Sequence, residues 1–140
     1  MPMLLRGLSA FPITPADAEG RVDVDALRKL VASLCAARVD SIGLLGSTGT
    51  YAYLSRSERR RALDAAIEEA TGQVPILVGV GALRTNEAVR LAQDAKAAGA
   101  AAGLLAPVSY TSLTEDEVFQ HFATVARESG LPLCIYDNPV

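Results

Sequence analysis

The sequence predicts an α/β protein built on a parallel sheet, and two features of its hydrophobic pattern support this fold class. Four segments carry apolar residues at the spacing of an amphipathic helix, and five short apolar runs surround and separate them. The runs do not alternate with polar residues, which is typical of strands covered on both faces of a parallel sheet. Such strands, recurring about every 30 residues, indicate successive βαβ units. The predicted strands are residues 8–13, 41–45, 75–80, 101–106 and 132–136.

The first two helices are predicted from an apolar stripe and from a start signal. In residues 27–35, apolar side chains fall at positions i, i+3, i+4, i+7 and i+8, and Asp23 or Asp25 is placed to cap this helix. The second helix opens with Ser55 and carries Glu58 three residues later, which is the spacing of a capping box. An apolar face follows that box and extends to about residue 70.

The third and fourth helices have equally clear ends. The third begins near Thr85, repeats small apolar residues on one face and stops at Gly99. The fourth opens with a second capping box, Thr114 to Glu117, and ends at Gly130. No linker or low-complexity stretch interrupts this order, so residues 1–140 are predicted to belong to one domain.

Two architectures use this order of strands and helices: the doubly wound open sheet and the (β/α)8 TIM barrel. A nucleotide-binding open sheet carries a glycine-rich phosphate loop after its first strand. Residues 11–16 hold no glycine at that position, and no such motif occurs at another strand-to-helix junction. The sequence therefore favours the barrel, of which this chain would hold about strands 1–5 and helices 1–4.

Composition excludes several classes of protein. The net charge is −3, and the arginine run at 59–61 is interpreted as the solvated face of a helix, so no nucleic acid partner is expected. No apolar stretch approaches the roughly 18 residues of a membrane span, and residues 1–6 lack a secretion signal. Cys35 and Cys134 are expected to be reduced thiols of a cytoplasmic protein. With His121 as its one histidine, assigned a structural role, the chain has little material for a metal site.

Polar residues that follow strands are the candidates for a functional site. Ser47 and Thr48 follow the second strand between glycines, where backbone N–H groups and two hydroxyls can point at one anion. The alternative is that this loop is only a tight turn. Tyr110 follows the fourth strand and Tyr136 ends the fifth. Each phenol can donate or carry a proton, or can simply pack as an amphipathic surface residue.

The order of the motifs resembles a known family. Gly46 to Gly49 are followed by Leu54 and Glu58, Val78 to Gly81, Tyr110, Gln120 to Phe122, and Tyr136 to Pro139. Together, these motifs are similar to those of the dihydrodipicolinate synthase / N-acetylneuraminate lyase family over essentially all 140 residues. The resemblance implies a (β/α)8 barrel and a class I aldolase mechanism. In that mechanism a lysine on strand six condenses with pyruvate or another 2-keto acid.

The resemblance also implies roles for single residues. Ser47 and Thr48 match the hydroxyl pair that binds the substrate carboxylate and helps relay protons. Tyr136 matches the proton shuttle beside the lysine, and Tyr110 matches a tyrosine that reaches into the neighbouring subunit's site. A homo-oligomer, dimer or tetramer, is therefore implied. No separate cofactor is required, because the protonated imine is the electron sink.

Two departures from the family pattern qualify these implications. Thr50 stands where the motif usually carries a glutamate, which removes a charge next to the carboxylate loop. The only lysines, Lys29 and Lys96, fall within predicted helices, so the Schiff-base lysine is expected after Val140 and the chain alone is expected to be inactive. A complete barrel needs about 250 residues, and the chain is expected to be a cut piece. The alternatives are another family member (an N-acetylneuraminate lyase-like enzyme or a sugar-acid aldolase or dehydratase) and a non-catalytic half-barrel.

Overall fold

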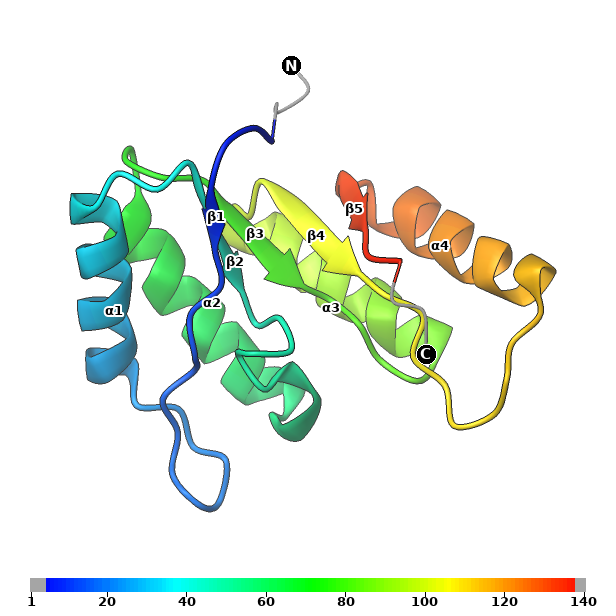
Figure 1. Ribbon diagram of the computed structural model, residues 1–140. Coiled ribbons are helices and arrows are strands. Elements are labelled where there is room, and N and C mark those ends of the chain that lie inside the picture. The colour runs from blue at the N-terminus through cyan, green and yellow to red at the C-terminus, as the bar shows by residue number, and fades with distance from the viewer. Residues whose placement is uncertain (1–4, 138–140) are drawn as a thin grey trace.

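The computed structural model describes residues 5–137. Its strands and helices alternate along the chain (Figure 1). The strands are β1 Ser9–Ala10, β2 Ser41–Leu44, β3 Ile76–Gly79, β4 Ala102–Leu105 and β5 Leu133–Ile135. The helices are α1 Val24–Ala36, α2 Arg56–Ala70, α3 Thr85–Ala98 and α4 Glu115–Ser129, with a short 3-10 turn, η1, at Tyr51–Tyr53.

The sheet is parallel throughout, and its strands lie side by side in the order β1-β2-β3-β4-β5. A doubly wound sheet would instead reverse its order around the first strand. Because βαβ crossovers are right-handed, an order without reversal carries every connecting helix to the same side. Figure 1 shows α2 and α3 behind the sheet and α1 and α4 beside its two edges, and within the described residues no helix covers the near face. This confirms the predicted arrangement: five strands and four helices of a barrel.

The first strand is much shorter than the sequence predicts. β1 keeps only Ser9–Ala10 of the predicted range 8–13, and it pairs with a single neighbour, β2. Pro12 has no N–H to donate, so the ladder ends early after Ala10. The other four strands, β5 included, match their predicted ranges to within one residue at each end.

The hydrophobic core lies between the sheet and the helix layer. One face of the central strands supplies Ile42, Leu44, Val78 and Leu105, each at most 2% exposed. The helices meet these branched side chains largely with alanine, which lets the helix backbones approach the sheet closely. The fully buried members of the helix layer are Leu27, Val31, Ala62, Ala66, Ala88, Ala92 and Val125.

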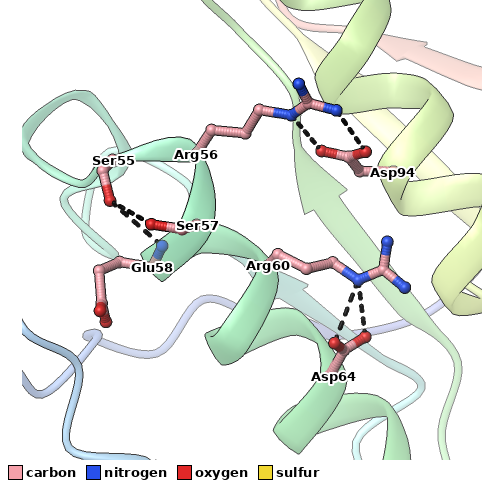
Figure 2. A network of polar contacts seen from close by, with 7 residues as sticks. All are labelled: Ser55, Arg56, Ser57, Glu58, Arg60, Asp64 and Asp94. Atoms are coloured by element: carbon pink, nitrogen blue, oxygen red, sulfur yellow. Dashed lines mark hydrogen bonds and ion pairs between the residues drawn. The ribbon is translucent and has the colours of Figure 1, made fainter.

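The helix caps follow the sequence signals with one exception. Asp23, rather than Asp25, caps α1, and Thr114 and Glu117 form the complete capping box of α4. The box predicted for α2 is only half formed. Ser55 accepts a hydrogen bond from the Glu58 N–H at 3.2 Å (Figure 2), but the Glu58 carboxylate accepts from the distant Val22 N–H at 2.8 Å. The second half of the box is therefore replaced by a tertiary hydrogen bond.

The arginine run is only partly a solvated face. Arg60 pairs with Asp64 one turn later at 2.9 Å, and Arg56 forms a two-pronged ion pair with Asp94 of α3 at 2.7 and 2.9 Å (Figure 2). Arg59, between them, is 7% exposed. The solvated-face interpretation is wrong for Arg59, because that position points from α2 to the sheet rather than to solvent.

His121 lies between α3 and α4. Its Nδ1 shares a 2.8 Å hydrogen bond with the Thr85 hydroxyl, while its Nε2 is buried and meets no partner within residues 5–137. Burial lowers the pKa of His121. This position fits the structural role assigned from the sequence.

His121 predicts a pH dependence of stability. Its folded-state pKa lies below its unfolded value of about 6.5, so unfolded chains bind the proton first as the pH falls. The stability that neutral His121 contributes is therefore present above about pH 6.5 and is lost progressively below it. Urea unfolding at several pH values should show this loss. His121→Gln, which keeps a neutral partner for Thr85, should flatten the curve between about pH 7 and 5. An equally steep curve in the variant would contradict the assignment.

Candidate active site

A cavity of about 530 Å³ lies at the carboxyl ends of the strands, on the face without helices. Its lining includes the two hydroxyl residues Ser47 and Thr48, the aromatic residues Phe11, Tyr51 and Tyr136, and the glycines of the β2 and β3 ends. Parallel strands bring their carboxyl ends to one edge of the sheet, which is why residues from three predicted loops meet here.

Glycines on the inner face make room for the cavity's aromatic wall. The Phe11 ring lies directly over Gly43, where an added Cβ would stand 2.6 Å from the Phe11 Cδ1. Gly46 is also beneath this ring, at 3.0 Å on the same measure. Phe11 therefore fills the inside of the sheet beside the hydroxyl loop. An apolar residue on an edge strand carries no polar signal, so sequence reasoning did not select Phe11 for the site.

The hydroxyl loop turns at residues other than its glycines. The flanking glycines do not adopt left-handed backbone; Leu45 and Thr50 do, with φ values of 54° and 55°. Gly49 is needed for close approach instead, because a Cβ there would lie 2.9 Å from the Leu45 Cα. A left-handed conformation costs a non-glycine residue of order 1–3 kcal/mol and is typical of functional loops.

Four successive N–H groups of the hydroxyl loop make no backbone hydrogen bond within residues 5–137. They belong to Gly46, Ser47, Thr48 and Gly49. The Ser47 and Thr48 side chains are exposed in the cavity and make no hydrogen bond with another described side chain. Unpaired backbone donors in a tight loop, with two hydroxyls, form a concave site suited to an anion.

Tyr136 lines the same cavity as the hydroxyl loop, and Tyr110 does not. Tyr136 follows β5, lines the cavity and is held by its N–H, which donates to the Leu105 carbonyl at 2.9 Å. No direct hydrogen bond between its hydroxyl and Ser47 or Thr48 occurs among the described residues. Tyr110 is 99% exposed and outside the cavity. The rest of the tyrosine motif, Asn138 and Pro139, lies outside the described residues.

Neither lysine reaches the cavity. Lys29 is exposed on α1, in the helix layer. Lys96 lies in the last turn of α3, and its Nζ is beside Gly130 at the end of α4. The ends of these helices precede the next strands, so Lys96 lies at the amino-end side of the sheet. No group of three or more His, Cys, Asp and Glu side chains within the described part of the chain is arranged to hold a metal ion.

Sequence reasoning also missed Tyr51 and Arg59. The Tyr51 ring lines the cavity, and the Arg59 guanidinium lies 5.3 Å from the centre of that ring. Arg59 donates to the carbonyls of Gly79 and Gly81, two glycines of the cavity wall. A tyrosine just beyond the hydroxyl loop was a usable signal, whereas a buried arginine inside a charged run was not.

Fold and site together define a class: half of a (β/α)8 barrel with a pocket that carries hydroxyl side chains at the carboxyl ends of its strands, where enzymes of this fold place their chemistry. The family model of the dihydrodipicolinate synthetase family matches residues 4–140. The chain belongs to that family.

Individual relatives agree with this assignment. The chain is 36% identical over 136 residues to a 4-hydroxy-tetrahydrodipicolinate synthase of Pseudomonas savastanoi, covering 97% of this chain and 47% of the relative. The crystal structure of a dihydrodipicolinate synthase from Agrobacterium tumefaciens matches with a TM-score of 0.93 and 62% identity, covering 96% of this chain and 45% of that one. A dihydrodipicolinate synthase from Acinetobacter baumannii, complexed with pyruvate, matches at 34% identity and a TM-score of 0.91, covering 97% and 47%.

This chain therefore spans a little under half the length of the relatives it matches. No helix within residues 5–137 is long and apolar enough to cross a membrane.

Proposed function

We propose that this chain is the N-terminal part of a single TIM-barrel domain of a cytoplasmic lyase. The lyase acts on pyruvate or another 2-keto acid through a lysine Schiff base, as a 4-hydroxy-tetrahydrodipicolinate synthase does. The observation that carries the proposal is that Ser47, Thr48 and Tyr136, from two loops far apart in the sequence, line one cavity. A relative of the same fold is complexed with pyruvate, which supports a small keto acid as substrate.

The roles follow from the groups each residue presents. Ser47 and Thr48 bind the substrate carboxylate with their hydroxyls, aided by the loop's unpaired N–H groups. Thr48 and Tyr136 carry protons. Schiff-base formation expels the carbinolamine oxygen as water, which needs a proton, and carbon–carbon bond formation moves a second proton on the partner aldehyde. A phenol beside a hydroxyl can deliver both without a metal.

Tyr110 takes part from a neighbouring subunit. Its ring is 99% exposed, so within its own subunit it is free to reach a partner. A homo-oligomer in which Tyr110 enters the partner's cavity would bury this ring. We therefore assign Tyr110 to catalysis across the interface of a dimer or tetramer.

A second candidate is a non-catalytic half-barrel that associates with a copy of itself or with a missing half. It is favoured by the two outer strands, β1 and β5, each paired on one side only within the described residues. Unpaired edges promote association. A different 2-keto-acid lyase or dehydratase of the same family is the nearer alternative, since Thr50 replaces the usual glutamate.

Reduction with borohydride in the presence of pyruvate tests the proposal. The 140-residue chain alone should give no adduct, because Lys29 and Lys96 lie away from the cavity. The whole protein should gain one adduct per subunit, on a lysine beyond Val140, as mass spectrometry of the reduced protein would show. An adduct on Lys29 or Lys96 would overturn the placement of the site. Absence of any adduct in the whole protein would favour the non-catalytic half-barrel.

A further inference from the structure

Arg59 is a buried cation without an anionic partner. It is 7% exposed, and no carboxylate within residues 5–137 forms an ion pair with it. Its Nε is buried without an acceptor among the same residues. Burial lowers the pKa of Arg59 only to about 10, so it stays charged at neutral pH. An unpaired buried charge is costly and persists where the surroundings or a ligand compensate it.

The guanidinium lies at the end of β2, where the hydroxyl loop begins. The Val80 N–H donates to β4, so the carbonyls of the residues on either side, Gly79 and Gly81, face the β2 side of the sheet. β2 ends at Leu44 and therefore offers no N–H groups to these two carbonyls. Arg59 donates to them instead, at 3.0 and 3.1 Å.

The same guanidinium also contacts Tyr51, a residue that lines the cavity. Tyr51 covers it at 5.3 Å, and the Tyr51 ring packs on Gly81, where an added Cβ would lie 3.4 Å from the Tyr51 Cε2. The Gly79 backbone, in turn, touches the peptide between Leu45 and Gly46, which starts the hydroxyl loop. Arg59 thus contacts both the glycines at the end of β3 and the Tyr51 ring, and both of these lie next to the proposed carboxylate site.

We infer that Arg59 is a positioning residue of the keto-acid site: from behind the cavity it fixes the Gly79–Gly81 wall and the Tyr51 ring, and it supplies the positive charge that a bound carboxylate faces. The inference rests on the proposed function. Charge attraction through a protein interior is screened much less than through water, so a cation that never touches the substrate still strengthens its binding.

The test compares neutral and charged replacements in the whole protein. Borohydride trapping over a range of pyruvate concentrations gives the half-saturating concentration and the maximal adduct. Arg59→Met should raise the half-saturating concentration by about tenfold or more with an unchanged maximum, and Arg59→Lys should stay within about threefold of the parent. Arg59→Gln gives the same comparison if the methionine variant does not fold.

Arg60→Met is the matched control. It removes the same charge from the next residue of α2, but Arg60 pairs with Asp64 at the surface (Figure 2). Its half-saturating concentration should equal that of the parent. The inference is overturned if the folded neutral variants of Arg59 bind pyruvate like the parent, if Arg59→Lys is as weak as they are, or if Arg60→Met weakens binding equally. A parent protein that forms no adduct would instead refute the proposed function.

Discussion

Tyr136→Phe should slow proton transfer at the site by about 10²- to 10⁴-fold, the usual contribution of a positioned acid–base group. The substitution removes only the phenolic oxygen. It leaves the ring, which follows β5 in the chain and lines the cavity. Exchange of the pyruvate methyl hydrogens with deuterated water measures this step in the whole protein without requiring the identity of the aldehyde. NMR follows the exchange directly.

Tyr53→Phe is the control for this experiment, because the Tyr53 ring is 84% exposed and does not line the cavity. Its exchange rate should match that of the parent protein. The borohydride adduct of Tyr136→Phe should still reach one per subunit, more slowly, since the lysine and the carboxylate loop are intact. Parent-like exchange in Tyr136→Phe would remove Tyr136 from the mechanism.

Gly79→Ala should disorganise the carboxylate loop. An added Cβ at Gly79 would collide with the Leu45 carbonyl oxygen and would lie 2.9 Å from the Leu45 carbonyl carbon. These are backbone atoms, and Leu45 is already left-handed, so the loop cannot yield without changing the turn that presents Ser47 and Thr48. Overpacking of this kind costs about 1–3 kcal/mol or more of stability. We expect pyruvate binding to be lost as well.

Gly81→Ala separates this clash from a general intolerance of side chains. Gly81 also lines the cavity, but an added Cβ there meets only the Tyr51 ring, at 3.4 Å, which is ordinary contact. Urea unfolding should therefore show a clearly larger loss of stability for Gly79→Ala than for Gly81→Ala. Equal losses would mean that close approach of Leu45 to Gly79 does not determine the loop.

Local sequence signals predicted most of the fold. Helical periodicity and the caps at Asp23 and Thr114 placed the helices, and continuous apolar runs placed the strands of a parallel sheet. These signals act between residues within one or two turns of each other, so the chain segment itself contains the cause. The sequence also selected Ser47, Thr48 and Tyr136 for one site, because parallel strands bring their ends to a common edge.

The remaining features arise from contacts between distant segments, which no local pattern encodes. Glu58 does not complete the capping box, because its carboxylate accepts a hydrogen bond from the Val22 N–H, 36 residues away. The hydroxyl loop has left-handed backbone at Leu45, and the Leu45 carbonyl lies against Gly79 of β3, 34 residues away. Arg59 belongs to a surface-like charged run, yet α2 packs so that its guanidinium lies at the end of β2. By itself the sequence determined the strands, the helices and the polar loops, whereas tertiary packing decided which charge lies behind the cavity.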